Sequence, residues 1–169
     1  MTTYIALLRA VNVGGTGKLA MADLRDICRE LGFEGVRTYI TSGNAIFRSA
    51  LAEHQVKAAL EARLADHASR PVGVIVRSRA ELADVVARNP FKDRAANRTV
   101  ALFVDEPLPA DALDHLVGWN GEDLELGKRE IYIHYGEGMA GSRLRVPAAR
   151  HGTARNLNTV AKLADMAGG

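Results

Sequence analysis

Residues 36–47, VRTYITSGNAIF, decide the fold of this 169-residue chain. Two apolar runs rich in β-branched and aromatic residues, 36–41 and 45–47, flank the turn sequence Ser42-Gly43-Asn44. Glycine and asparagine both tolerate the positive φ of a tight hairpin, so this stretch predicts two adjacent antiparallel strands. The elements on either side of the hairpin then decide how the sheet is arranged.

The hairpin lies in the middle of an alternating order of strands and helices. Residues 4–8 and 72–76 are short apolar runs, typical of buried strands. Apolar residues recur at helical spacing over 21–31, ending at Gly32, and over 53–66. The order βαββαβ predicts a ferredoxin-like plait, in which helices cover one face of an antiparallel sheet.

The rest of the chain predicts a second, similar half. Ser78 and Glu81 form a capping box that opens a helix, and residues 99–104 read as a strand. A short helix over 112–117, a hairpin over 124–135, a short helix near Ser142 and a final helix over 157–166 complete the order. We therefore expect an α+β fold of two ferredoxin-like halves, residues 1–78 and 79–169, each an antiparallel sheet with helices on one face.

Composition excludes several classes of protein. No apolar run approaches the roughly 18 residues that cross a bilayer, and the start lacks a signal peptide's pattern, so we expect a cytoplasmic protein without membrane contact. Cys28 is the only cysteine, and it lies on an apolar helical face that predicts a core thiol. The five histidines show no metal-ligand spacing, and no G-x-S-x-G elbow is present. Neither a metal, a cofactor nor a catalytic residue is indicated, and catalysis stays open.

Charge is unevenly distributed although its formal sum is only +2. Residues 105–137 carry nine acids against Lys128 and Arg129, whereas residues 138–164 carry five basic residues and no acid. The first 22 residues hold Arg9 and Lys18, again without an acid. If the two acid-free segments meet in space, they form an anion site. The alternative is that the segments fold into an ordinary mixed surface.

The connection over residues 11–21 is the first candidate site. It is about twice as long as the corresponding connection after residue 104, and glycines precede its helix, where unpaired N–H groups attract anions. It is no P-loop, because Asn12 and Leu19 stand where the first glycine and the hydroxyl residue belong. It is no dinucleotide fingerprint either, because the second strand turns back as a hairpin. A flexible surface excursion is the alternative.

The second candidate is HGTARNLNTVAKL, residues 151–163. Thr153 and Asn156 are both competent N-caps for the final helix, Arg155 lies beside them, and Lys162 follows within the helix. Such a helix start attracts negative charge through its free N–H groups and its dipole. The alternative is an ordinary capped helix whose basic residues are solvated.

Several separated stretches resemble one family. RAVNVGG at the start, LGF, RTYITSGNAIF, NPF at 89–91 and GTARNLNTVAKL at 152–163 are together similar to the bacterial domain-of-unknown-function family 1697. The resemblance implies a plait-type α/β fold and no established activity. Its motifs match Arg9, Asn12, Gly14, Gly15, Lys18, Ser42, Gly43, Asn44, Thr153, Arg155, Asn156 and Asn158. Ala10, Ala20 and Leu157 depart from it, where glycine, lysine and tryptophan are expected.

These observations predict a site for a small phosphorylated or carboxylated ligand between the glycine-rich loop and the final helix start. Arg9 and Arg155 are expected to hold the anion, Lys18 to add charge, and Asn12 and Asn156 to orient it. The full predicted set is Arg9, Asn12, Gly14, Gly15, Lys18, Ser42, Asn44, Thr153, Arg155 and Asn156. A nucleic-acid-binding module and a homo-oligomeric interaction domain are the alternatives, and the oligomeric state stays open.

Overall fold

The computed structural model describes residues 1–13, 17–137 and 139–168. The chain divides into two compact units, Met1–Ala83 with Leu163–Gly169 and Asp84–Lys162. Each unit contains one four-stranded sheet, and every strand pair in both sheets is antiparallel. Four α-helices accompany the sheets in the described part of the chain. The predicted α+β fold with two antiparallel sheets is confirmed.

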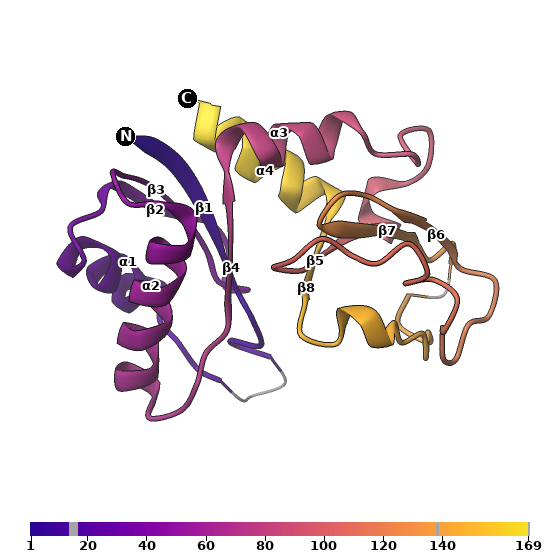
Figure 1. Cartoon of the computed structure of the whole chain (residues 1–169), viewed down its shortest axis with the longest axis horizontal. Helices are drawn as coiled ribbons and strands as arrows, with labels where there is room; N and C mark the ends of the chain where they lie inside the picture. Colours follow the sequence, from indigo (N-terminus) through magenta and orange to yellow (C-terminus); the bar gives the residue numbers. More distant parts are fainter. Residues whose placement is uncertain (14–16, 138, 169) are drawn as a thin grey trace. The chain divides into compact units, whose positions relative to one another are not determined.

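The first unit is a sheet covered by two helices on one face. Its strands are β1 (Thr2–Leu8), β2 (Glu34–Thr38), β3 (Asn44–Ser49) and β4 (Val74–Ser78), in the order β2-β3-β1-β4. Helices α1 (Met21–Glu30) and α2 (Glu53–Ala68) lie side by side on one face of this sheet (Figure 1). The four strands and two helices lie close to the segments that the sequence predicts.

The core of this unit follows from the alternation of side chains along β1. Tyr4, Ala6 and Leu8 point into a cluster that includes buried residues of both helices, such as Leu24 and Leu60. The intervening residues Ile5 and Leu7 face the opposite side of the sheet and are also fully buried. Strand β1 is therefore buried on both faces, whereas the edge strand β2 is largely exposed.

The hairpin that decides the fold is present, but its turn differs from the prediction. Ile40 (φ 50°) and Gly43 (φ 90°) adopt the left-handed region, whereas Asn44 is the first residue of β3. Asn44 is fully buried, and its side chain donates back to the Tyr39 carbonyl at 2.9 Å and to Ser42 Oγ at 3.0 Å. Of the two residues expected to tolerate positive φ, Gly43 adopts it, whereas Asn44 closes the turn with its side chain.

The second unit repeats the strand order of the first. Its strands are β5 (Thr99–Phe103), β6 (Asp123–Leu126), β7 (Glu130–His134) and β8 (Thr153–Asn156). They are arranged as β6-β7-β5-β8, which matches β2-β3-β1-β4 position for position. The predicted hairpin of the second half is β6–β7.

Three predictions for this unit are wrong. The segment predicted as a short helix forms turns over residues 110–115, in which Ala112 N–H donates to the Pro109 carbonyl and Asp114 N–H to the Asp111 carbonyl, and Val117 then bridges to Arg145. Over the described residues 139–146 around Ser142 there is no helix, and a single 3₁₀ turn, Pro147–Ala149, follows instead. The sequence predicts no strand over residues 153–156, whereas the structure forms β8 there.

The remaining helices begin where the capping residues predict. Helix α3 (Arg79–Ala87) follows a reciprocal capping box, in which Glu81 N–H donates to Ser78 Oγ and Ser78 N–H donates to Glu81 Oε1. Helix α4 (Leu157–Gly168) begins after Asn156, whose Oδ1 accepts from Thr159 N–H at 2.9 Å. In the part of the chain described, no helix combines the length and apolarity needed to cross a membrane.

Candidate functional site

The loop after β1 is held by the side chain of Asn12. Its Nδ2 donates to the carbonyls of Leu19 and Thr41, both at 2.8 Å, and its Oδ1 accepts from Leu19 N–H at 2.8 Å. The backbone N–H of Asn12 donates to the Gly17 carbonyl at 2.9 Å. One asparagine therefore closes the loop on itself and fastens it to the β2–β3 turn.

The backbone of this loop is strained at Ala10 and Asn12. Ala10 (φ 57°) and Asn12 (φ 53°) are non-glycine residues in the left-handed region, and Gly17 (φ 63°) joins them. A Cβ at Gly17 would lie 2.5 Å from the Ala10 carbonyl oxygen and 2.6 Å from the Arg70 guanidinium. Such conformations persist only where the surroundings impose them, and they are concentrated at functional sites.

The structure brings this loop together with the predicted turn residues. Leu8 N–H donates to the Gly43 carbonyl at 2.9 Å, and a Cβ at Gly43 would lie 2.6 Å from Val11 Cγ2. Because Asn12 also binds the Thr41 carbonyl, the loop and the turn containing Ser42 and Asn44 form one packed structure. Asn12, Ser42 and Asn44 are thus adjacent, as the prediction of a shared site requires.

Three cations flank the loop. Arg9 begins it, with its N–H bonded to the Gly73 carbonyl at 2.8 Å, and Lys18 is exposed near its end. Arg70, which the sequence analysis missed, lies against Gly17. No pattern in the sequence connects Arg70 to this loop, because their proximity arises from the fold. Gly14 and Gly15 lie outside the described residues.

The C-terminal part of the predicted site lies on β8 and the start of α4. Arg155 is buried, and its guanidinium donates to Thr153 Oγ1 at 2.7 Å and to the Ala154 carbonyl at 3.0 Å. Desolvation lowers the pKa of Arg155 to about 10. Asn156 caps α4, whereas Thr153 is a strand residue, so only one of the two predicted caps is a cap. Arg9 to Lys18 belong to the first unit, whereas Thr153, Arg155 and Asn156 belong to the second. The proximity of these two groups therefore stays a prediction.

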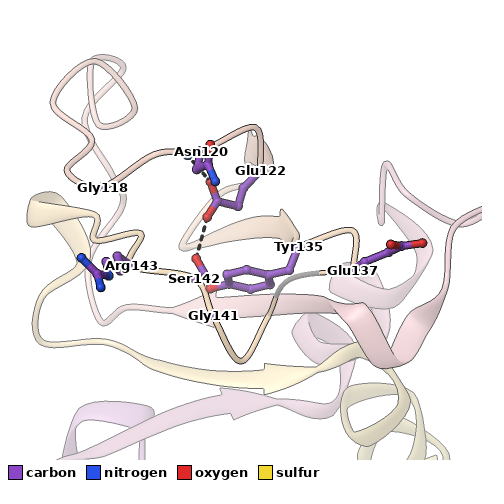
Figure 2. A pocket seen from close by; sticks show the side chains of 8 residues that line it. All are labelled: Gly118, Asn120, Glu122, Tyr135, Glu137, Gly141, Ser142 and Arg143. Atoms are coloured by element: carbon purple, nitrogen blue, oxygen red, sulfur yellow. Dashed lines mark hydrogen bonds between the residues drawn. The ribbon is translucent and has the colours of Figure 1, made fainter.

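The second unit contains a polar pocket of about 480 Å³ that the sequence did not predict (Figure 2). Glu122, which is 8% exposed, lines this pocket, and two hydrogen bonds hold its carboxylate in place. Asn120 N–H donates to its Oε1 at 2.6 Å, and Ser142 Oγ donates to its Oε2 at 2.5 Å. Tyr135, Glu137 and Arg143 are among the other lining residues.

The electrostatics of this pocket favour a structural role for Glu122. The hydrogen bonds from Ser142 and from the Asn120 backbone lower the pKa of Glu122, so the carboxylate stays ionised and is a poor base at neutral pH. Burial, together with the charge of Glu122, raises the pKa of Tyr135. The bonded carboxylate connects the segment before β6 to the loop after β7, and among the lining residues no histidine stands ready to activate the Ser142 hydroxyl.

The structure also bears on two kinds of chemistry, thiol reactivity and metal binding. Cys28 is fully buried, and burial raises the pKa of its thiol to about 12, which leaves it protonated and unreactive as predicted for a core thiol. Within the residues that the structure describes, no group of three or more His, Cys, Asp or Glu side chains is placed to hold a metal ion.

Comparison with known proteins agrees with this architecture. The model of the family described as "Protein of unknown function (DUF1697)" matches residues 1–132, which include the loop, the turn and most of the second unit but not the motif at 152–163. A solved structure, described as conserved bacterial protein SP0830 from Streptococcus pneumoniae, has 31% sequence identity, a TM-score of 0.81 and 98% coverage of both chains. No curated protein matches the sequence. The chain therefore belongs to the DUF1697 family of proteins of unknown function.

Proposed function

We propose that this protein binds a small phosphorylated or carboxylated ligand at the loop between β1 and α1. The observation that carries the proposal is the position of Arg70, whose guanidinium lies against Gly17 in a loop that already contains Arg9 and Lys18. Three basic residues thus gather at a segment whose neighbouring sequence, residues 1–22, holds no acid. This charge arrangement favours an anion.

The loop is also pre-organised. The three side-chain hydrogen bonds of Asn12 and the left-handed conformations of Ala10 and Asn12 hold the described parts of the loop, residues 9–13 and 17–20, in a defined arrangement. A fixed loop loses less conformational entropy on binding than a flexible one, so more of the charge attraction appears as affinity. Asn12 therefore shapes the site, and the cations hold the ligand.

The chemistry of the cations defines the ligand class. Arginine donates two parallel hydrogen bonds to phosphate or carboxylate oxygens, whereas lysine contributes a compact charge without a fixed geometry. In this proposal Arg9 and Arg70 orient the anion and Lys18 adds attraction. The sequence-based prediction that Thr153, Arg155 and Asn156 take part is retained as part of the same hypothesis.

The test is a thermal-shift titration of the full chain with inorganic phosphate, glycerol 3-phosphate and citrate at constant ionic strength. A ligand of the native state raises the Tm by mass action. Because a charged hydrogen bond contributes about 1.5–3 kcal/mol, Arg9→Ala and Arg70→Ala should each weaken the response about tenfold or more. Arg155→Ala tests the C-terminal contribution in the same assay.

The matched control is Arg29→Ala, which removes an exposed arginine of α1 that pairs only loosely with Asp26 at 3.5 Å. It should leave the response unchanged. If Arg9→Ala, Lys18→Ala and Arg70→Ala all respond to these anions as the unmodified chain does, the proposed site is wrong. A single-stranded oligonucleotide provides the comparison with nucleic-acid binding, whose affinity falls steeply with salt.

A further inference from the structure

A second cationic hollow lies elsewhere in the first unit. It has a volume of about 140 Å³ and is lined by three arginines: Arg37 from β2, Arg48 from β3 and Arg79 from the first turn of α3. Thr3 of β1 and the last residues of α4, Ala167 and Gly168, line it too. The lining residues include no acid.

Strand pairing places the first two arginines on one face of the sheet. Arg37 is paired with Ile46, so Arg48, two residues further along β3, is its diagonal neighbour on the same face. The register shifts between Glu34 and Arg37, as at a β-bulge, and bulges redirect side chains. Gly35 (φ 61°) lies in this bulge, and a Cβ there would come within 3.1 Å of the Arg48 guanidinium.

The third arginine and one helix end complete the hollow. Arg79 Nη2 would lie 3.8 Å from a Cβ placed on Gly168, so its guanidinium extends to the last turn of α4. Arg37 Nη2 donates to the Met166 carbonyl at 2.6 Å, which holds that side chain in place. The guanidinium groups therefore approach one small space from three different elements.

The C-terminal end of α4 compensates part of the positive charge of this hollow, since its Met166 carbonyl accepts a hydrogen bond from Arg37. An ion pair adds little: Arg48 lies 4.0 Å from Glu34, at the limit of such contacts, and both side chains are more than half exposed. Exposed ion pairs of this kind contribute little to stability. The two neighbouring guanidinium groups of Arg37 and Arg48, on the same face of the sheet, repel each other. An anion in the hollow would offset this repulsion.

We propose that this arginine pocket binds a single phosphate group, either as inorganic phosphate or as the end of a small phosphomonoester. Its volume is well below the roughly 300–1,000 Å³ of sites that enclose a whole small molecule, so only one group enters it. Three guanidinium forks can supply donors to several oxygens of a tetrahedral phosphate, whereas a carboxylate offers only two oxygens. Thr3 lies near the start of β1 and Arg9 follows its end, so the pocket is separate from the loop proposed above.

The test is an NMR titration of the ¹⁵N-labelled full chain that follows the arginine Nε–Hε signals at constant ionic strength. The probes are inorganic phosphate, ethyl phosphate and dimethyl phosphate, added separately. We expect the signals of Arg37, Arg48 and Arg79 to move together and to saturate with the first two probes. If inorganic phosphate binds more tightly than ethyl phosphate, the ligand is free phosphate, and if ethyl phosphate binds more tightly, the ligand is a phosphomonoester. Dimethyl phosphate, a singly charged diester, should bind more weakly than either.

Three variants connect the result to this pocket. The double variant Arg48→Gln/Arg79→Gln should weaken phosphate binding at least tenfold, while Arg29→Gln and Arg9→Ala/Lys18→Ala should not. If the double variant is unfolded, Arg79→Gln alone serves, because Arg79 is exposed and its loss is unlike the loss of a buried core residue. Signals that move linearly without saturation, or a folded Arg79→Gln variant that binds phosphate unchanged, would overturn the proposal.

Discussion

The side-chain amide of Asn12 binds the Thr41 carbonyl at 2.8 Å, across 29 residues of sequence. The same side chain binds both the N–H and the carbonyl of Leu19, so one residue connects the end of β1, the start of α1 and the β2–β3 turn. This relationship explains why an asparagine, which tolerates the left-handed region better than other non-glycine residues, stands at a position with φ 53°.

Asn12→Ala should destabilise the protein. It removes three side-chain hydrogen bonds, leaves the Leu19 N–H and two carbonyls to find other partners, and places alanine in a left-handed conformation. We expect a loss of about 2–4 kcal/mol in the free energy of unfolding, measured in urea. Asn158→Ala, at an exposed position of α4, is the matched control and should change it by less than about 0.5 kcal/mol. Equal effects of the two substitutions would contradict the role given to Asn12.

Substitution of two glycines by alanine can distinguish the free-energy cost of a left-handed backbone from the cost of steric crowding. Gly32 (φ 83°) and Gly43 (φ 90°) both adopt the left-handed region, but a Cβ would meet nothing within 4 Å at Gly32 and would lie 2.6 Å from Val11 at Gly43. Gly32→Ala should therefore cost about 1–2 kcal/mol, from the conformation alone. Gly43→Ala should cost clearly more, because Val11 and Leu8 must also move. Urea unfolding of both variants checks this order, and a Gly43→Ala variant no less stable than Gly32→Ala would refute it.

The raised pKa of Cys28 leads us to expect that the stability of the protein falls at alkaline pH. Burial raises the pKa of the thiol from 9.0 in the unfolded chain to about 12 in the folded one. The stability contributed by the neutral thiol is present below pH 9 and is lost as the pH rises from 9 towards 12, by about 1.4 kcal/mol per pH unit. Cys28→Ala removes this component, so the difference in unfolding free energy between the two proteins should decline between pH 9 and 10.5. A constant difference over this range would contradict the assignment.

Reactivity of the same thiol provides an independent check. At pH 8 the buried, protonated Cys28 should react with a disulfide reagent such as DTNB only when the structure opens, so added urea should accelerate labelling in parallel with unfolding. Fast labelling of the native protein would show that the thiol is accessible and ionised.

The lowered pKa of Glu122 leads us to expect that the stability of the protein falls at acid pH. Hydrogen bonds from Ser142 and Asn120 lower the pKa of Glu122 below 4.5, so its contribution to stability is present above pH 4.5 and is lost as the pH falls through the lower, folded value. Ser142→Ala removes the first of these bonds and should reduce the acid dependence of the second unit. Acid titrations followed by the fluorescence of Trp119, whose indole N–H binds the Glu122 carbonyl, compare Ser142→Ala with the unmodified chain. Identical acid transitions would exclude this role for the bond.

The sequence predicts the fold well where side-chain periodicity is strong. The hairpin over residues 36–47, the amphipathic helices and the reciprocal capping of Ser78 and Glu81 are all local signals, and each is present in the structure. Strand β8 carries no such signal, since three of its four residues are polar and its position is set by pairing with β5. The apolar spacing of residues 112–117 predicts a helix, but the structure forms turns there, and Val117 pairs with Arg145 far along the chain.

The candidate sites are less predictable for a related reason. Arg70 lies 53 residues after Gly17, and the arginines of the second hollow are distributed over positions 37, 48 and 79. Only the strand register, the bulge at Gly35 and the course of α4 bring these side chains together. Asn12 could be singled out from its glycine-rich surroundings, yet its actual role, two hydrogen bonds to Leu19 and one to Thr41 in the β2–β3 turn, requires the coordinates.

The division of α4 between the two units has a practical consequence for handling the protein. Residues from Leu163 onward belong with the first unit, where Met166 accepts the hydrogen bond from Arg37. A truncation or a protease cut after Lys162 would thus damage the structure that begins at the opposite terminus, although it removes only the last few residues. A fragment ending near Ala83 lacks the same turns of helix, so neither half can be prepared by a single cut of the chain.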